Sequence, residues 1–321
     1  MAVILCGGVS TMFRKTAVGV VVVVAVLAGV AFFMPRPSPP VLAKLLTMYA
    51  TVAPITVHPV SEGIYYVSGG MANSGIIVAN SSVILVDAQM FAPAAKKVLK
   101  AIAQITPKPV STIILTHSDP DHVNGLPAYP RGLEIIAQEN TGPEMQEALQ
   151  NPLMNTTTTP AELKDYLPTK TVKDSETIVV DGVTLQLMHL APAHTDSDLI
   201  IYLPAQDVVF TGDILAPDFS QYPGIHLNKH GSSLGWIKTM QALIALNAQV
   251  YVSGHGQPLK RADLQERLQI AMSRRAEIEQ LVAQHKTLDE VKAALNDPPP
   301  RGLAKMFPTF TETTYQELTQ Q

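Results

Sequence analysis

The sequence predicts an α+β fold, a four-layer αββα sandwich in which two packed β-sheets carry helices on their outer faces. Two halves of the chain each run through short β-branched segments and close with helical segments, and 46% of the 321 residues are hydrophobic. That hydrophobic fraction is enough for a large buried core. We expect the sandwich over residues 51–260 and a helical extension packed on it over residues 261–321.

The segment before the sandwich is expected to export or anchor the protein. Residues 16–34 are nineteen residues without a charge, preceded by the pair Arg14 and Lys15. This length just reaches what a membrane-spanning helix needs, whereas the apolar region of a cleaved signal peptide has about 7 to 15 residues. A retained signal anchor is the first expectation and a cleaved signal the alternative. Residues 1–15 would then stay in the cytosol and residues 35–50 would form a proline-rich linker.

This arrangement predicts a protein attached to the inner membrane and facing the periplasm or the extracellular side, or a secreted protein if the signal is cleaved.

Hydrophobic periodicity gives the order of the elements. Strands are expected over residues 55–60, 63–68, 76–79, 83–87 and 110–115, and again over 176–180, 183–190, 199–203, 208–211 and 250–253. Helices are expected over residues 93–104, 138–150, 234–246 and 261–285, with a polar excursion over 151–170 and a further helix opening at the capping box Thr287 to Glu290. The strand–helix–strand unit over residues 83–115 places the following loop at the carboxyl edge of a sheet, where open α/β sheets bind ligands.

Charge and cysteine content narrow the function. The net charge is −4, only 16% of the residues are charged, and no dense block of Lys and Arg occurs, so a nucleic acid partner is excluded and a small-molecule substrate is expected. The only cysteine, Cys6, precedes the predicted domain. A bound metal would therefore be held by nitrogen and oxygen ligands alone.

The loop after the strand over residues 110–115 is the strongest candidate for such a site. It contains four side chains that bind hard or borderline cations within six residues, namely His117, Asp119, Asp121 and His122. In an extended loop the first two project to the same side, while the last two can turn toward a neighbouring position. One short loop can therefore start two metal sites.

Three further candidates each follow an apolar run and are flanked by small residues. They are His194, Asp213 in Gly212-Asp213, and His255 in Gly254-His255-Gly256. Taken singly, each is more often a loop or capping residue. Their shared position at strand ends favours a common site.

The order His-x-x-x-Asp-His, His-Thr, Gly-Asp and Gly-His-Gly over about residues 52–260 resembles the metallo-β-lactamase superfamily. The resemblance implies the four-layer sandwich and two divalent metal ions, zinc first and manganese or iron as alternatives. One ion would be held by His117 and His194 and the other by Asp121, His122 and His255, with Asp213 between them. Asp121 and Asp213 would also act in catalysis, and water activated by the ions would hydrolyse the substrate.

Asp119 departs from the superfamily pattern HxHxDH, which has a histidine at this position. The resemblance makes Asp119 the third ligand of the first metal. An anionic ligand makes that site harder, which shifts its preference toward manganese or iron and makes its bound water less acidic. The alternative is that the first metal is lost altogether.

Several residues near the predicted ligands have two possible roles. Asp87 and Asp198 either support a histidine ligand from behind or cap a turn. Lys229, His226 and His230 lie in the loop after Asp213, where the resemblance implies part of the substrate wall. As side chains of a polar loop they are equally consistent with a solvated surface.

The sequence thus predicts a metallo-hydrolase that acts on a small ester, lactone, thioester or amide. A β-lactamase ranks only second within this class. The resemblance implies that Asp213 gives the bridging carboxylate shared with glyoxalase II, lactonases and phosphodiesterases, rather than the unbridged arrangement of β-lactamases. Two other classes stay open: a mono-iron oxygenase similar to persulfide dioxygenases, and a catalytically silent metal-binding protein.

Overall fold

Two β-sheets form the centre of the fold. The computed structural model describes residues 39–150, 160–216, 221–300 and 307–320. The first sheet has seven strands in chain order, β1 (Thr56–Ser61), β2 (Ile64–Ser68), β3 (Ser74–Val78), β4 (Val83–Val86), β5 (Val110–Ile114), β6 (Glu134–Gln138) and β7 (Lys170–Val172). Its first four strands are antiparallel neighbours, and β4 to β7 run parallel.

The second sheet has five strands in the order β12-β11-β10-β9-β8. They are β8 (Ser175–Val180), β9 (Val183–Met188), β10 (Ile200–Leu203), β11 (Val208–Gly212) and β12 (Val250–Ser253). Only the pair β11 and β12 is parallel within it.

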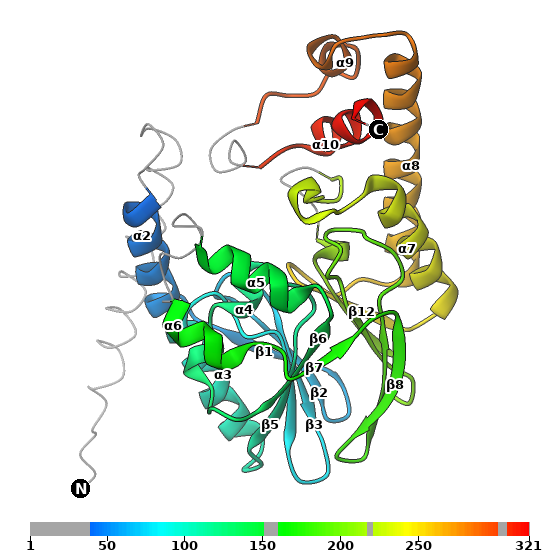
Figure 1. The fold of residues 1–321 in the computed structure, drawn as a ribbon. Coiled ribbons are helices and arrows are strands. Elements are labelled where there is room, and N and C mark those ends of the chain that lie inside the picture. The colour runs from blue at the N-terminus through cyan, green and yellow to red at the C-terminus, as the bar shows by residue number, and fades with distance from the viewer. Residues whose placement is uncertain (1–38, 151–159, 217–220, 301–306, 321) are drawn as a thin grey trace, which may run out of the picture.

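Helices cover the outer face of each sheet (Figure 1). On the first sheet lie α3 (Ala92–Ile105), α5 (Thr141–Gln150) and α6 (Pro160–Leu163), while α7 (Ser233–Leu246) and α8 (Arg261–Ala283) lie on the second. The short α4 (Pro120–Val123) follows β5, and α9 (Leu288–Ala294) and α10 (Phe310–Thr319) follow α8.

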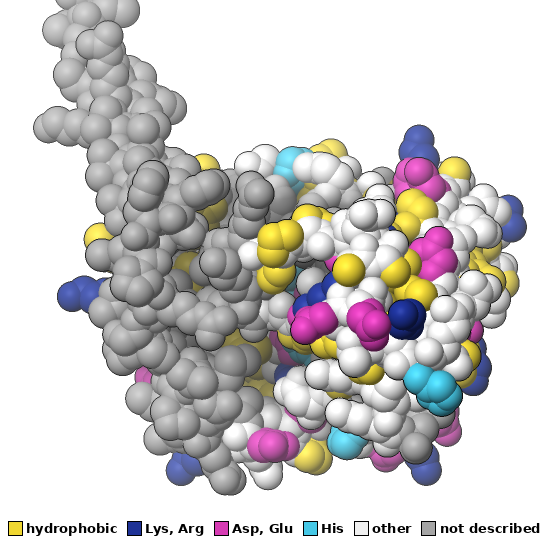
Figure 2. Space-filling model, turned by 90° about the horizontal axis from the view of Figure 1, so that it is seen from above, with side chains coloured by type: hydrophobic (Ala, Val, Ile, Leu, Met, Phe, Trp, Pro, Cys, Tyr) yellow, Lys and Arg dark blue, Asp and Glu magenta, His cyan; other side chains and the backbone are white. Residues whose placement is uncertain are grey.

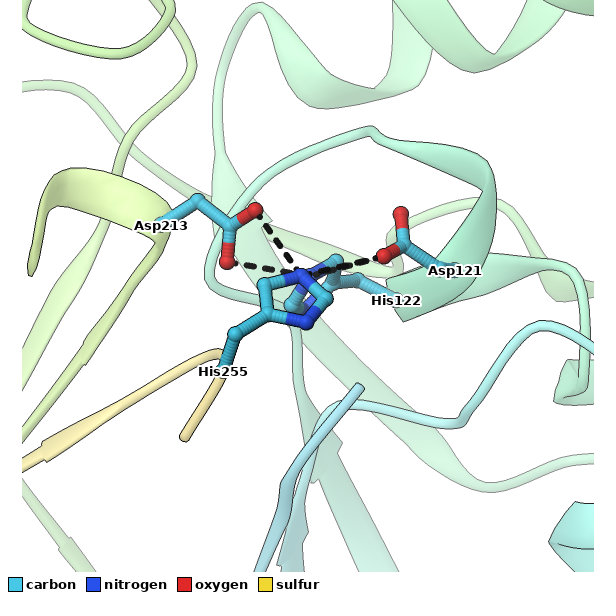
Figure 3. Close-up of side chains that lie close together, drawn as sticks. All are labelled: Asp121, His122, Asp213 and His255. Atoms are coloured by element: carbon cyan, nitrogen blue, oxygen red, sulfur yellow. Dashed lines mark ion pairs between the residues drawn. The ribbon is translucent and has the colours of Figure 1, made fainter. Parts of the chain in front are cut away.

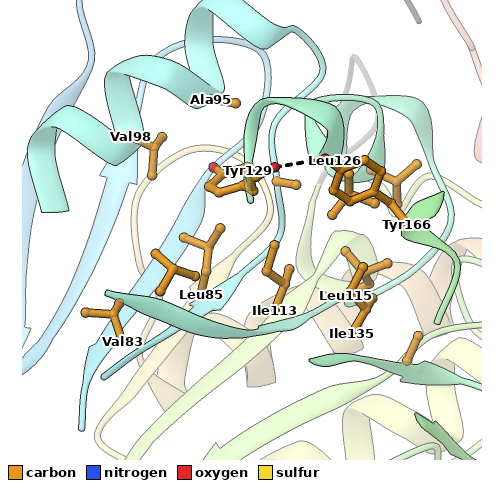
Figure 4. Close-up of a cluster of buried hydrophobic side chains, with 14 of the residues drawn as sticks. Val83, Leu85, Ala95, Val98, Ile113, Leu115, Leu126, Tyr129, Ile135 and Tyr166 are labelled. Atoms are coloured by element: carbon orange, nitrogen blue, oxygen red, sulfur yellow. Dashed lines mark hydrogen bonds between the residues drawn. The ribbon is translucent and has the colours of Figure 1, made fainter. Parts of the chain in front are cut away.

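Alternation along the strands explains the four layers. Leu85 on β4 and Ile113 on β5 pack toward α3, as Figure 4 shows, whereas their neighbours Ile84 and Ile114 belong to the core between the two sheets. Successive strand side chains point to opposite faces, so a strand that is apolar at every position must be covered on both sides. The expected α+β class with two packed sheets is therefore confirmed.

The structure differs from the expected elements at four places. Residues 134–138 form β6, so the helix expected from residue 138 begins at Thr141, and the described part of the polar excursion contains α6 and β7. Helix α10 lies within the helical extension expected over residues 261–321, but it was not predicted individually. The linker expected over residues 35–50 is helical from Pro39 onward, as α2 (Pro39–Val52).

Helix α2 forms because its apolar residues have a surface to pack on. Ala50 is buried against Phe91 and Ala94 at the start of α3, and Leu46, one helical turn earlier, packs on the same cluster. Lys97 on α3 donates hydrogen bonds to the carbonyl oxygens of Ala50 and Ala53. Proline is tolerated at the first turn, where its missing N–H has no helical acceptor.

Residues 16–34, where the anchoring or signal segment is expected, lie outside the described residues. Among the helices that the structure does describe, none is both long and apolar enough to cross a membrane. On the face seen in Figure 2, basic and acidic side chains alternate and form no continuous block of one sign.

The C-terminal extension packs on the second sheet and its helices. Phe310 of α10 is 1% exposed and belongs to one apolar cluster with Leu264 of α8 and Trp236 of α7. Its ring stacks on Tyr222, with 5.5 Å between ring centroids.

Substituting Phe310→Ala should therefore lower the free energy of unfolding by about 3 kcal/mol, the usual loss for a buried phenylalanine. Phe307, which is 47% exposed, offers the matched control, and Phe307→Ala should cost less than about 1 kcal/mol. Urea unfolding followed by circular dichroism measures both. Equal losses in the two variants would show that α10 does not pack as described.

Candidate metal centre

Side chains from both halves of the chain meet at one edge of the two sheets. The loop after β5 and helix α4 supply four of them, and the turns after β9, β11 and β12 supply the others: His117, Asp119, Asp121, His122, His194, Asp213 and His255. Each turn follows a strand whose buried side chains fix its end in space. The structure thus brings together all seven residues expected from the sequence to bind metal.

One group of ligand atoms consists of Asp121, His122, Asp213 and His255, shown in Figure 3. The Nε2 atom of His255 lies 3.1 Å from Oδ2 of Asp121 and 3.2 Å from Oδ2 of Asp213. The Nε2 atom of His122 lies 3.3 Å from Oδ1 of Asp213 and 3.8 Å from Oδ2 of Asp121. Two imidazoles and two carboxylates therefore point at a common centre.

Asp213 also belongs to a second group, with His117 and His194, in which the ligand atoms again lie within 4.8 Å of one another. It is the residue shared by both groups. Gly212 and Gly254 make room for it: a Cβ on Gly254 would lie 2.0 Å from Oδ1 of Asp213, and a Cβ on Gly212 would lie 2.5 Å from Oγ1 of Thr116. Gly212 also has φ 52°, which glycine adopts without strain.

Asp119 lies on the side of this second group. Its Oδ2 is 3.2 Å from Nε2 of His194 and 3.6 Å from Nε2 of His117. Its Oδ1 accepts a hydrogen bond from the Nζ of Lys229 at 2.6 Å. The carboxylate is thus held from behind by a lysine while its other oxygen faces the imidazoles.

Asp87, directly after β4, orients two of the histidines. Its Oδ2 accepts hydrogen bonds from Nδ1 of His122 and from Oγ1 of Thr116, both at 2.8 Å. Oγ1 of Thr116 in turn lies 3.0 Å from Nδ1 of His117. With Nδ1 occupied on both rings, the Nε2 atoms face the centre, which is how an outer carboxylate fixes a ligating histidine.

Asp198 acts on the backbone of the turn that carries His194. Its carboxylate accepts hydrogen bonds from the backbone N–H groups of His194 and Thr195, and from the hydroxyl of Thr195 at 2.8 Å. The ring itself is oriented by the carbonyl oxygen of Gly224, which lies 2.9 Å from Nδ1 of His194. Asp198 therefore combines the two roles considered from the sequence, because it closes a turn and by doing so places His194.

Three buried ligand atoms indicate that this arrangement fits cations. The Nε2 atoms of His117 and His122 and Oδ1 of Asp213 have no hydrogen-bond partner. Buried polar atoms are nearly always paired, and unpaired nitrogen and oxygen atoms within two ligand groups that share Asp213 are what two bound metal ions would require.

The pKa values of the clustered side chains also indicate a site that attracts cations. Burial raises the pKa of Asp213, but the neighbouring His255 and His122 outweigh it and hold that pKa well below its usual value. Burial lowers the pKa of His255, yet Asp213 and Asp121 raise it to about 10. The carboxylates thus draw positive charge into the cluster, whether carried by protons on the histidines or by bound cations.

The sequence pattern of the metallo-beta-lactamase superfamily matches residues 67–255, which span every ligand candidate. The chain belongs to the metallo-β-lactamase superfamily. The expected resemblance is confirmed by this match, and the fold and the site described above are those of a superfamily member.

Three relatives show how varied the proteins similar to this chain are. A linear primary-alkylsulfatase of Pseudomonas sp. (strain ATCC 19151) is 24% identical over 57% of this chain and 41% of its own length. The 2,4-dinitroanisole O-demethylase subunit alpha of Nocardioides sp. (strain JS1661) is 26% identical over 66% of this chain and 60% of its own. The structure of a stereoselective inverting sec-alkylsulfatase from Pseudomonas sp. superposes with a TM-score of 0.65 at 20% identity, over 85% of this chain and 52% of that one.

The chain therefore spans only about half the length of the two curated relatives it matches. The sec-alkylsulfatase structure shows that this chain and that enzyme have the same fold.

The three residues expected in the substrate wall have different positions. His230 is exposed at the surface and belongs to none of the groups of ligand atoms among the described residues. Lys229 is only 14% exposed and is bound to Asp119. His226 lies with its Nδ1 3.3 Å from Oδ2 of Asp119, in a third group of ligand atoms with Asp119 and His194. Of the three, two belong to the centre itself.

A polar network beside the centre was not expected from the sequence. Lys229 donates a second hydrogen bond to Oγ of Ser118 at 2.6 Å, and Ser118 donates to the carboxylate of Glu144. Ser197 donates to the same carboxylate oxygen at 2.6 Å. Burial raises the pKa of Glu144 to about 7. The sequence offers no signal for this contact, because Glu144 lies in a helix with an ordinary polar pattern.

Removing the charge of Asp87 should weaken zinc binding by about 10 to 100-fold while the fold is kept, because loss of an outer partner of a ligating histidine has that effect. Asp87→Asn is the suitable change, since Asn also adopts the positive φ of 60° found here. Competition with a chromophoric chelator measures the affinity.

Asp181→Asn is the matched control. Asp181 also has positive φ and accepts hydrogen bonds from two hydroxyl groups, those of Ser81 and Ser82, but lies on the far loop between β8 and β9. The zinc affinity of the Asp181→Asn variant should equal that of the wild type. An Asp87→Asn variant that binds zinc equally well would contradict the role of Asp87 in orienting the histidines.

Proposed function

We propose that the protein is a hydrolase that uses two divalent ions, zinc first, to cleave a small ester, lactone, thioester or amide. The observation that carries this proposal is the set of unpaired buried atoms on His117, His122 and Asp213, which come from the loop after β5, helix α4 and the turn after β11. His117 and His194 would hold one ion and Asp121, His122 and His255 the other, with Asp213 shared. When bound, such ions lower the pKa of water toward neutrality and polarise the bond to be cleaved.

The remaining chemistry belongs to the side chains of the chain itself. Asp213 belongs to both ligand groups, so its carboxylate would lie between the two ions. Asp121 has a side chain that is 24% exposed, so it can orient an incoming water or pass a proton to the leaving group. Asp87 and Asp198 hold the histidines in place without touching the substrate.

A serine nucleophile is disfavoured by the same contacts. The hydroxyl of Ser118 contacts Glu144 and Lys229, and none of its contacts is with an imidazole. A triad needs a histidine within hydrogen-bond reach of the nucleophile.

Sulfate monoesters are a second candidate substrate class. This candidate is favoured by the alkylsulfatase that is 24% identical to the chain and by the sec-alkylsulfatase structure whose likeness extends over 85% of it. Lys229 provides a cation 2.6 Å from Asp119, but two of its hydrogen bonds are already used within the protein. A carboxylic acid derivative therefore remains the first choice.

Treatment with a strong chelator should abolish hydrolysis, and added zinc or manganese should restore it. Asp213→Asn should lower kcat/KM by about 100-fold or more, since it removes a ligand and not only an outer partner. Asp207→Asn is the control, because Asp207 lies in the turn between β10 and β11, and its hydrogen bonds are with Tyr202 and the backbone of residues 203, 249 and 250. Activity that survives chelation, or equal activity in the two variants, would contradict the proposal.

The substrate class is tested with p-nitrophenyl acetate, a γ-lactone, an acyl thioester, an anilide, a cephalosporin and an alkyl sulfate. We expect the oxygen and sulfur esters to be hydrolysed at least about tenfold faster than the alkyl sulfate, a difference of roughly 1.4 kcal/mol in barrier height. Preference for the alkyl sulfate would assign the second candidate class. Preference for the cephalosporin would assign a β-lactamase.

A further inference from the structure

We propose that His226 is a ligand of the first ion and supplies the imidazole that the loop lacks at Asp119. This assignment rests on the proposed two-ion function and moves His226 from the substrate wall into the metal centre. It explains how the site keeps nitrogen ligands although the second histidine of the HxHxDH pattern is replaced.

The backbone holds His226 against the turn that carries His194. The N–H of His226 donates to the carbonyl oxygen of His194 at 2.9 Å, and the carbonyl oxygen of His226 accepts from the N–H groups of Lys229 and Gly231 at 2.9 and 3.0 Å. A Cβ on Gly231 would lie 2.2 Å from the carbonyl oxygen of His194, so only glycine permits this close approach. His226 is therefore placed by the same turn that positions a predicted ligand.

Three imidazole nitrogens converge on one oxygen of Asp119. Nδ1 of His226 lies 3.3 Å from Oδ2, Nε2 of His194 lies 3.2 Å from it, and Nε2 of His117 lies 3.6 Å from it. The rings of His194 and His226 have centroids only 4.3 Å apart. Neutral imidazoles gain little from crowding in this way, whereas a shared cation would bind all three nitrogens at once.

Lys229 makes the substitution at Asp119 electrostatically tolerable. Its ammonium group binds Oδ1 of Asp119, so the carboxylate enters the site already paired with a positive charge. The proposed donor set around the first ion joins two groups of ligand atoms, His117 with His194 and Asp213, and Asp119 with His194 and His226, which have His194 in common. Such a nitrogen-rich set suits zinc, so the shift toward manganese or iron expected from Asp119 alone is offset.

The side chain of His226 is partly exposed to solvent, as expected of a metal ligand at the entrance of a site. Its side chain is 24% exposed, compared with 6% for His194 and 1% for His117. The first ion would thus be bound by two deeply buried histidines and one partly exposed histidine, much as the other group combines buried His122 with His255, which is 35% exposed.

The test is a zinc titration of the full chain in its wild-type, His226→Ala, His226→Gln and His230→Ala forms, each first freed of metal. His230 belongs to the same loop but is exposed, so it is the matched control. We expect two ions in the wild type and in His230→Ala. In the His226 variants one ion should remain tightly bound and the affinity for the other should fall by about 100-fold or more.

Cobalt(II) gives a readout independent of activity. Compared with the wild type, the visible absorption of cobalt at the site of the first ion should change in the His226 variants and stay unchanged in His230→Ala. His226→Gln keeps a side chain of similar length in case His226→Ala does not fold, as judged by circular dichroism. Adding Asp119→His to either variant should restore the affinity for the first ion, because it returns the missing imidazole to the loop.

The outcomes separate this assignment from the proposed function. A wild type that binds two ions, with both His226 variants binding two at unchanged affinity, would overturn the assignment of His226 and leave the hydrolase intact. A wild type that binds fewer than two ions would overturn the two-ion function and the assignment with it.

Discussion

Burial of carboxylates among imidazoles is the interaction on which the rest of this structure depends. Asp87, Asp119 and Asp213 are all buried, and each lies within hydrogen-bonding or ion-pair distance of an imidazole or an ammonium group. A carboxylate in such a position is strongly destabilised unless cations or hydrogen-bond donors surround it. The strand ends, the tight glycines and the loop after β11 are arranged to provide those partners.

The pairing also explains why ligands arrive from both sheets. Asp87 directly follows β4 of the first sheet and is hydrogen-bonded to His122. Asp213 directly follows β11 of the second sheet and lies 3.3 Å from the same imidazole. His122 thus joins the two halves through its two ring nitrogens. Because Asp213 is common to both ligand groups, a change there would disturb both at once.

Asp119 shows how a departure from a motif is balanced by its surroundings. The lost imidazole leaves an extra negative charge, and Lys229 neutralises it through one oxygen while the second oxygen faces the histidines. Ser118 and Glu144 continue this contact away from the centre and fix the lysine. The substitution is therefore part of a connected polar network that reaches α5.

Much of the fold and most of the centre could be predicted because they follow local rules. Apolar β-branched runs that stop at Asp87, Asp213 or His255 signal a strand and a residue at its end. β6 was missed because Ile135 and Ile136 form a short apolar run that periodicity cannot distinguish from a helix start. Helix α10 carries a capping box from Thr309 to Glu312 that would have revealed it.

Contacts between distant segments could not be predicted in this way. Nothing in the loop after Asp213 indicates that His226 and Lys229 reach Asp119, because that depends on how the loop packs on the turn of His194. The same holds for Glu144, whose partners lie on two other loops.

The most direct test of the two-ion centre is anomalous diffraction at the zinc edge from crystals of the protein grown with zinc. Two peaks are expected, one about 2.0–2.1 Å from Nε2 of both His122 and His255 and one at the same distance from Nε2 of His117 and His194, with Asp213 between them. A single peak, no peak, or peaks away from these nitrogens would contradict the account.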